Sequence, residues 1–203
     1  GPHRDLHDGA HTVPTRRAGD RATQVEANVS GGYDVFWSNP TSSQYDVWKV
    51  DASGNFVSSI KAKLWEDEVK FNVDLNGDGD TGLVTVEAIG SVHLKHGDNT
   101  YNGAPQYYIK DSSNDPIGLT KGGALRGPDF SPGWNATQVE KNGGHYEVLR
   151  SHSSGKYDVW KFDASGDFVS SIKAKLWQDE LKFNQDLNGD GDTGLVTVEA
   201  IGS

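Results

Sequence analysis

The chain has 203 residues, a hydrophobic share of 34% and a formal net charge of −10 at pH 7. This negative charge argues against nucleic acid and anionic membrane surfaces as partners, and no apolar run approaches the roughly 18 residues that membrane insertion requires. The chain contains no cysteine, which excludes disulfides and thiolate metal sites. Its 25 glycines favour many turns and short strands over long helices.

An internal repeat organises the chain. Residues 45–90 align with residues 157–202 at a constant offset of 112, and only five of these 46 positions differ. A shorter match upstream aligns residues 23–26 with 137–140. Self-similarity of this kind predicts tandem modules. We therefore expect a first, N-terminally shortened repeat at residues 1–90, in which residues 1–5 are a tag remnant or frayed, and a complete second repeat at residues 91–203.

Each repeat is expected to be mainly β, in the α+β class. Residues 33–37, 45–50 and 56–63 are rich in β-branched and aromatic side chains and are separated by turn residues, which predicts a three-stranded antiparallel meander. Residues 64–73 favour a short helix, and residues 83–89 alternate as a strand. Between the repeats, residues 91–133 are too apolar for a solvated linker, and they include a predicted strand at 106–110.

After the predicted helix, each repeat contains the segment Asp-Leu-Asn-Gly-Asp-Gly-Asp-Thr-Gly, at residues 74–82 and 186–194. Calcium takes six to eight oxygen ligands, and a D-x-N-x-D-G loop supplies them at alternate positions, with glycine at the sharp turn in position six. The segment therefore predicts an EF-hand-like calcium loop in each repeat. The candidate ligands are Asp74, Asn76, Asp78, Asp80, Asp186, Asn188, Asp190 and Asp192.

The twelfth position of such a loop should hold a bidentate Glu, but here it is Thr85 or Thr197. A closing ligand must then come from elsewhere, either from Glu68 and Glu180 on the helix or from Glu87 and Glu199 after the loop. Lanthanides or manganese would fit the same oxygen donors, so Ca²⁺ is inferred from its hardness and availability. The alternative interpretation is a solvated Asp/Asn/Gly turn without a metal.

The six tryptophans divide into two groups. Trp48 and Trp160 lie in the middle of a predicted central strand and are expected in the core, as are Trp65 and Trp177 at the start of the helix. The remaining two, Trp37 and Trp134, lie near turns and have no counterpart in the other repeat. They are the better candidates for stacking on the sugar rings of a polysaccharide or cell-surface glycan.

Nothing in the sequence predicts an enzyme. There is no G-x-S-x-G, no H-E-x-x-H and no nucleophile–base arrangement. The acidic pair of Glu66 and Glu68 fits a general acid and base, but a solvated helix face beside a cation explains it more simply. The Asp115-Pro116 bond is acid-labile, and whether it is processed is left open.

Taken together, these residues resemble the tryptophan-rich repeat domain first recognised at the C-termini of large cyanobacterial proteins. The pattern combines Gly-Trp, Glu-Lys, paired strand aromatics and the Asp-rich loop. The second repeat carries it at Gly133, Trp134, Glu140, Lys141, Tyr146, Val148, Tyr157, Trp160, Asp163, Gly166, Glu180, Phe183 and residues 186–191. The first carries it at Glu26, Tyr33, Val35, Trp37, Tyr45, Trp48, Asp51, Gly54, Asn55, Glu68, Phe71 and residues 74–79.

Two positions depart from this pattern. The first repeat has Asp20 and Arg21 where the second has Trp134, and Arg150 replaces a tryptophan of the family. The resemblance implies an extracellular or cell-surface, calcium-dependent, non-catalytic module that contacts neighbouring repeats of a larger bacterial protein. We therefore expect a structural or adhesive repeat, and the alternative is a carbohydrate-binding module.

Overall fold

The computed structural model describes residues 16, 18–42, 44–61, 64–75, 78–98, 105–112, 115–174 and 176–195. The chain divides into two compact units, Gly1–Gly82 with Asp98–Gly103, and Leu83–Gly97 with Ala104–Ser203. The predicted boundary after Gly90 marks the end of the sequence repeat, and the compact units divide slightly earlier in the chain. Within the described residues, no helix has the length and apolar character needed to cross a membrane.

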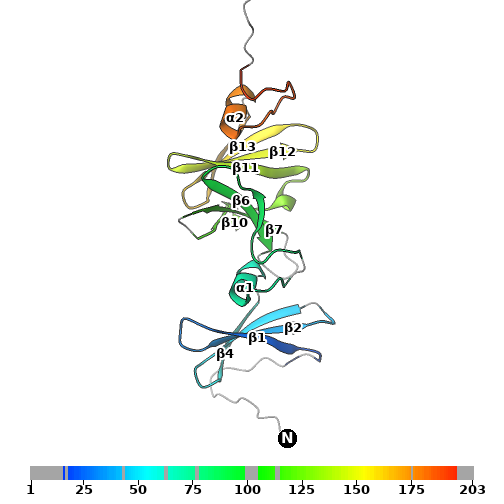
Figure 1. The fold of residues 1–203 in the computed structure, drawn as a ribbon, viewed down its shortest axis with the longest axis vertical. Coiled ribbons are helices and arrows are strands. Elements are labelled where there is room, and N and C mark those ends of the chain that lie inside the picture. The colour runs from blue at the N-terminus through cyan, green and yellow to red at the C-terminus, as the bar shows by residue number, and fades with distance from the viewer. Residues whose placement is uncertain are drawn as a thin grey trace, which may run out of the picture. The chain divides into compact units, whose positions relative to one another are not determined.

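The first unit is a four-stranded antiparallel sheet followed by a helix (Figure 1). Its elements are β1 (Arg21–Ala27), β2 (Tyr33–Asn39), β3 (Gln44–Val50), β4 (Phe56–Lys61) and α1 (Leu64–Phe71). The three predicted strands and the helix are confirmed, but the prediction of three strands was one too few. The strand that was not predicted is β1, at the edge of the sheet. It contains a single large apolar residue, Val25, and most of its side chains are exposed. Its sequence therefore lacks the alternation of apolar and polar residues that marks a strand.

The second unit contains the same arrangement and a second sheet. The repeated elements are β11 (Trp134–Asn142), β12 (His145–His152), β13 (Tyr157–Asp163), β14 (Phe168–Lys173) and α2 (Leu176–Phe183). The added sheet has the order β5 (Val84–Glu87), β6 (Val92–Asp98), β7 (Pro105–Asp111) and β8 (Ile117–Gly118). A small ribbon of β9 (Thr120–Lys121) and β10 (Ala124–Leu125) and the 3-10 turn η1 (Pro128–Phe130) connect this sheet to β11. The predicted strands at 83–89 and 106–110 are confirmed as β5 and β7.

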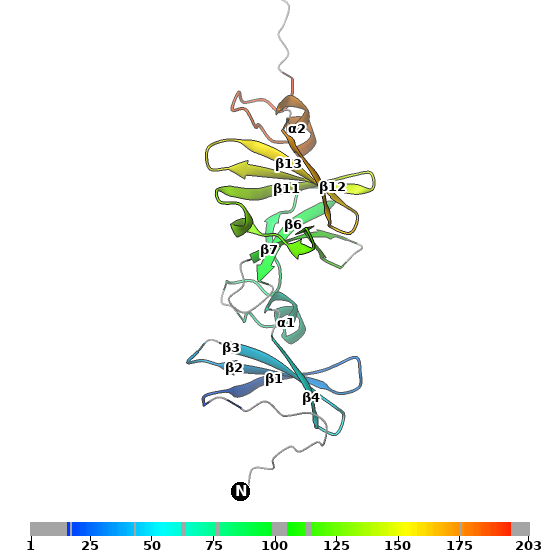
Figure 2. The same cartoon turned by 180° about the vertical axis from the view of Figure 1, so that it is seen from behind.

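Three layers make up the second unit, with the β11–β14 sheet in the middle. Side chains alternate along β12, so Tyr146 and Val148 enter the core shared with Leu94 and Ile109 of the added sheet. Leu149 points the opposite way, into a smaller core with helix α2. The views in Figures 1 and 2 agree that β6 and β7 lie on one side of the β11–β14 sheet and α2 on the other.

Each helix ends in the same way, and the ending leads the chain into the Asp-rich loop. Asn72 and Asn184 follow the last helical residues with φ of 51° and 48°. Asn is one of the few side-chain-bearing residues that adopts this left-handed conformation readily, so it serves as a helix C-cap. The backbone amide of the next residue then bonds to the carbonyl of Glu68 or Glu180 at 3.1 Å. This turn ends the helix two residues earlier than residue 73, the predicted end.

Candidate functional site

The feature common to both units is a buried glutamate that ties together the two ends of the Asp-rich loop. Glu180 is fully buried, and its two carboxylate oxygens accept hydrogen bonds from the backbone amides of Leu187 at 3.2 Å and Gly194 at 3.0 Å. Glu68 bonds to the equivalent amides of Leu75 and Gly82 at 3.1 and 2.9 Å. We call this arrangement the glutamate clamp. From the sequence alone the two glutamates were candidate closing ligands for a metal, and their hydrogen bonds to the loop amides were not predicted.

Inside the second loop, carboxylate and amide oxygens accept hydrogen bonds from successive backbone amides. Asp186 accepts bonds from Asn188 at 3.1 Å and Gly191 at 2.9 Å, and Asn188 and Asp190 each accept one from the residue two positions later. The backbone hydrogen bonds from Gly189 and Gly191 favour the ionised form and lower the pKa of the Asp186 carboxyl below its usual value. The loop thus curls around the side chain of its first aspartate.

The first loop follows the same pattern where it is described. Gly79 donates its amide to Asp74 at 3.0 Å, and Asp80 donates to Asp78 at 2.9 Å. The sixth-position glycines have φ of 94° at Gly79 and 92° at Gly191, which is the turn conformation that the loop pattern predicts. Asn76, a predicted ligand, lies outside the described residues.

The donor chemistry of the loops fits a hard divalent cation, because every candidate ligand presents oxygen. Asp78, Asp80, Asp190 and Asp192 are exposed and accessible to an ion. Across the part of the chain that the structure describes, however, no three acidic or histidine side chains converge as a metal-binding group. Of the other proposed closing ligands, Glu87 accepts a hydrogen bond from the amide of Ile89, and Glu199 lies outside the described residues.

An ion pair joins each helix to its sheet beside the loop. Lys70 bonds to Asp34 on β2 at 2.8 Å, and Lys182 bonds to the equivalent Glu147 on β12 at 2.7 Å. Burial raises the pKa of Glu147, but the hydrogen bonds from Lys182 and His145 outweigh burial and leave the pKa below its usual value. For Asp34 the balance is the same, with Lys70 and Asn28 as the donors. Both ion pairs hold the helix, and therefore the clamp, against the sheet.

These ion pairs predict acid sensitivity. The pKa of the Glu147 carboxyl is lower in the folded protein than in the unfolded chain, where it is near 4.5. Its ionised form therefore stabilises the fold at pH values above 4.5, and this stabilisation is lost as the pH falls through the folded-state pKa. Lys182→Met should lower the free energy of unfolding at pH 7 by about 1–3 kcal/mol. This loss lies between those expected for breaking a fully exposed and a fully buried ion pair, because the pair is partly buried. The difference from wild type, measured by urea unfolding, should shrink at pH 3. A difference that stays constant with pH would contradict this account.

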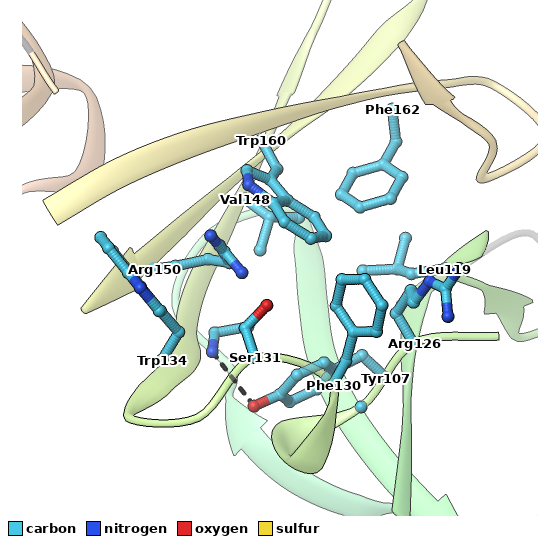
Figure 3. A pocket seen from close by; sticks show the side chains of 12 residues that line it. Tyr107, Leu119, Arg126, Phe130, Ser131, Trp134, Val148, Arg150, Trp160 and Phe162 are labelled. Atoms are coloured by element: carbon cyan, nitrogen blue, oxygen red, sulfur yellow. Dashed lines mark hydrogen bonds between the residues drawn. The ribbon is translucent and has the colours of Figure 1, made fainter. Parts of the chain in front are cut away.

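A cluster of aromatic and arginine side chains lies on the other face of the β11–β14 sheet (Figure 3). The guanidinium of Arg150 lies 3.6 Å from the ring centre of Trp160 and 4.8 Å from that of Trp134, and two hydrogen bonds of 2.8 and 2.7 Å fix it to Asp158. Phe130 meets Trp160 edge-on. The pocket between these rings has room for about one water molecule, so it does not accommodate a sugar ring.

The tryptophan predictions have mixed outcomes. Trp48 and Trp160 are buried in the core, as predicted. The core prediction for the helix pair is wrong, because Trp65 is only half-buried and Trp177 is 42% exposed. The helix turns Phe183 and Glu180 toward the sheet, which leaves Trp177 on the outer side. Trp134 is half-buried, whereas Trp37 is buried under the guanidinium of Arg16, which lies 3.6 Å from its ring centre.

The fold and the paired loops define a tandem-repeat protein of mainly β structure. A family model, the tryptophan-rich Synechocystis species C-terminal domain, matches residues 13–82 and 100–194, and the chain belongs to this family. Both matched segments end at the last glycine of an Asp-rich loop, at the residue that the glutamate clamp holds. No curated protein and no solved structure matches the chain.

Proposed function

We propose that the chain is a calcium-stabilised, non-catalytic structural or adhesive repeat of a secreted or cell-surface protein. The observation that carries this proposal is the glutamate clamp, which occurs in both units and joins an exposed, oxygen-rich loop to a fully buried carboxylate. A merely solvated turn needs no such internal anchor. With the anchor in place, an ion held by the loop stabilises the helix and the sheet beneath it.

The mechanism is linkage between binding and folding. Asp74, Asn76 and Asp78, with the backbone carbonyl of Asp80, would hold the ion in the first unit, and Asp186, Asn188, Asp190 and Asp192 are their counterparts in the second. Without the ion, clustered carboxylates repel one another. At a calcium concentration about 100 times the dissociation constant, each site adds about 2.7 kcal/mol to the free energy of unfolding. Extracellular modules of this type bind with dissociation constants of roughly 10⁻⁴–10⁻³ M.

A thermal melt tests the proposal. Wild type should melt at a clearly higher temperature in ~10 mM calcium than in chelator, because each site favours the folded state. The double variant Asp74→Ala with Asp186→Ala should lose most of this increment, whatever its stability in chelator. The matched control, Glu66→Gln with Asp115→Asn, removes the same formal charge at exposed positions outside the loops and should keep the increment. Equal melting curves of wild type with and without calcium would refute the proposal.

The second candidate function is carbohydrate binding, favoured by the exposed ring of Trp177 and the half-buried ring of Trp134. Flat aromatic surfaces of this kind can stack on a polysaccharide or cell-surface glycan. A glycan array in calcium, with wild type and the double variant Trp134→Ala with Trp177→Ala, tests this function. No binding by wild type would rule this function out, and binding that persists in the variant would rule out these two rings as the binding surface.

A further inference from the structure

Three cationic side chains of the second unit lie against one group of aromatic rings, although the chain as a whole has a net charge of −10. The Lys121 ammonium lies 4.4 Å from the ring centre of Trp160, and the Arg150 guanidinium lies 3.6 Å from it. The Arg126 guanidinium lies 3.9 Å from the ring centre of Phe130. We call the pocket in Figure 3 the arginine pocket, and its lining includes Arg126, Phe130, Trp134, Arg150 and Trp160.

The two arginines of this pocket differ in how their charges are balanced. Arg150 forms two hydrogen bonds to the carboxylate of Asp158. Arg126 has no ion pair with a described carboxylate, and its Nη2 donates a hydrogen bond to the carbonyl oxygen of Lys121. The Nε of Arg126 is buried and has no hydrogen-bond partner among the described residues. A buried donor without an acceptor is costly, so an anionic oxygen beside Arg126 would gain a charge-assisted hydrogen bond.

Backbone contacts hold Arg126 in place. Its amide donates a hydrogen bond of 2.8 Å to the carbonyl of Leu119, and its carbonyl accepts one of 2.7 Å from the amide of Tyr107. The next residue, Gly127, packs so closely on β7 that a Cβ atom there would lie 1.6 Å from the carbonyl oxygen of Pro105. The backbone that carries the guanidinium is therefore already fixed, and a ligand need not order it on binding.

The size of the pocket decides which group can enter it. The space holds about one water molecule, which matches a single carboxylate oxygen but not a sugar ring. Outside this space, the Phe130 ring is 40% exposed and Trp134 is half-buried. Flat aromatic rings can pack on the apolar face of a sugar. The arrangement therefore fits a sugar whose carboxylate reaches into the pocket while its ring stays on the aromatic rim.

We propose that the arginine pocket binds the carboxylate of a uronic acid residue in an acidic polysaccharide. Arg126 holds the carboxylate, and Phe130 and Trp134 contact the sugar ring. The site belongs to the second unit, because the first unit has Trp37 at the register position of Arg150. The proposal rests on the second candidate function, carbohydrate binding, and narrows it to an anionic ligand. It does not depend on the calcium proposal.

Isothermal titration calorimetry with hexagalacturonate, a soluble uronic acid oligomer, tests the proposal without any substitution. Wild type in calcium should bind the oligomer, and the fully methyl-esterified oligomer should bind at least about tenfold more weakly, because it has the same sugar rings but no charge. Raising the salt concentration from ~0.05 M to ~0.5 M should weaken binding of the acid form. Equal binding of the acid and the ester would overturn this site but leave carbohydrate binding standing.

Variants then locate the binding site. Arg126→Gln should weaken binding at least about tenfold, and Phe130→Ala at least about threefold. The matched control Lys49→Gln removes the same charge at an exposed position of the first unit and should bind like wild type. A thermal melt of each variant confirms that it is folded.

Three results would overturn the proposal. The first is no binding by wild type up to ~10 mM oligomer. The second is unchanged binding by folded Arg126→Gln, which is expected if calcium instead bridges the uronate to the Asp-rich loops. The third is equally tight binding of hexaglutamate, which has carboxylates but no sugar rings and would identify an acidic peptide as the partner.

Discussion

Replacing Glu180 with alanine should lower the free energy of unfolding of the second unit by about 3–6 kcal/mol. Its carboxylate accepts two backbone hydrogen bonds in a fully buried position, and a hydrogen bond to a charged group contributes about 1.5–3 kcal/mol. Removal leaves the amides of Leu187 and Gly194 without this acceptor and leaves a cavity under the helix. Urea unfolding followed by tryptophan fluorescence measures the loss.

Two further variants make this result specific to the clamp. Glu180→Gln keeps the shape of the side chain but replaces one carboxylate oxygen by an NH₂ group, which cannot accept a hydrogen bond from the backbone amide that it faces. The loss in the free energy of unfolding should therefore be roughly half of that caused by Glu180→Ala. Gln178→Ala, at an exposed position on the same helix, should change the free energy of unfolding by less than about 0.5 kcal/mol. If Glu180→Ala were as stable as Gln178→Ala, the clamp would have no structural role.

Val139→Lys should unfold the second unit or destabilise it by several kcal/mol. Val139 is completely buried between two sheets, in an apolar cluster that includes Leu94 and Tyr146. An ammonium group placed in this cluster loses its hydration, which is costly in free energy. Loss of the cooperative unfolding transition, or of dispersed amide signals in an NMR spectrum, would report the result.

The equivalent substitution in the first unit is the matched control. Val25 occupies the same register position but is exposed, so Val25→Lys should shift the free energy of unfolding by about 0.5 kcal/mol or less. Equal effects at the two positions would mean that the β5–β8 sheet does not bury Val139 as described.

The repeat and the regular elements could be predicted because they depend on local signals. The aromatic strands at 33–37 and 45–50 alternate clearly, and the Asn-Gly-Asp-Gly turns mark the loops. Strand β1 gave no such signal, because its residues face solvent on both sides in the first unit. The exposure of Trp177 was not predicted either, because its place at the start of the helix does not show which side of the helix faces the sheet.

Of the candidate site, only the oxygen donors of the loop could be predicted from the sequence. Aspartates at alternate positions indicate an oxygen-rich loop from the sequence alone. Glu68 and Glu180 were recognised as acids close to this loop, but their hydrogen bonds to amides seven and fourteen residues further along the chain depend on the path of the folded backbone. The Lys70–Asp34 and Lys182–Glu147 pairs likewise join residues that only the packing of helix on sheet brings together.

The strand order of the sheets has a consequence for how the protein folds. In every four-stranded sheet of the described chain, each strand pairs with the strand next to it in sequence. Such local pairing keeps contact order low for a β-protein, and low contact order favours fast folding. Each sheet can therefore assemble hairpin by hairpin as the chain leaves the ribosome. A long array of such modules would fold in the order of its synthesis, without waiting for distant segments.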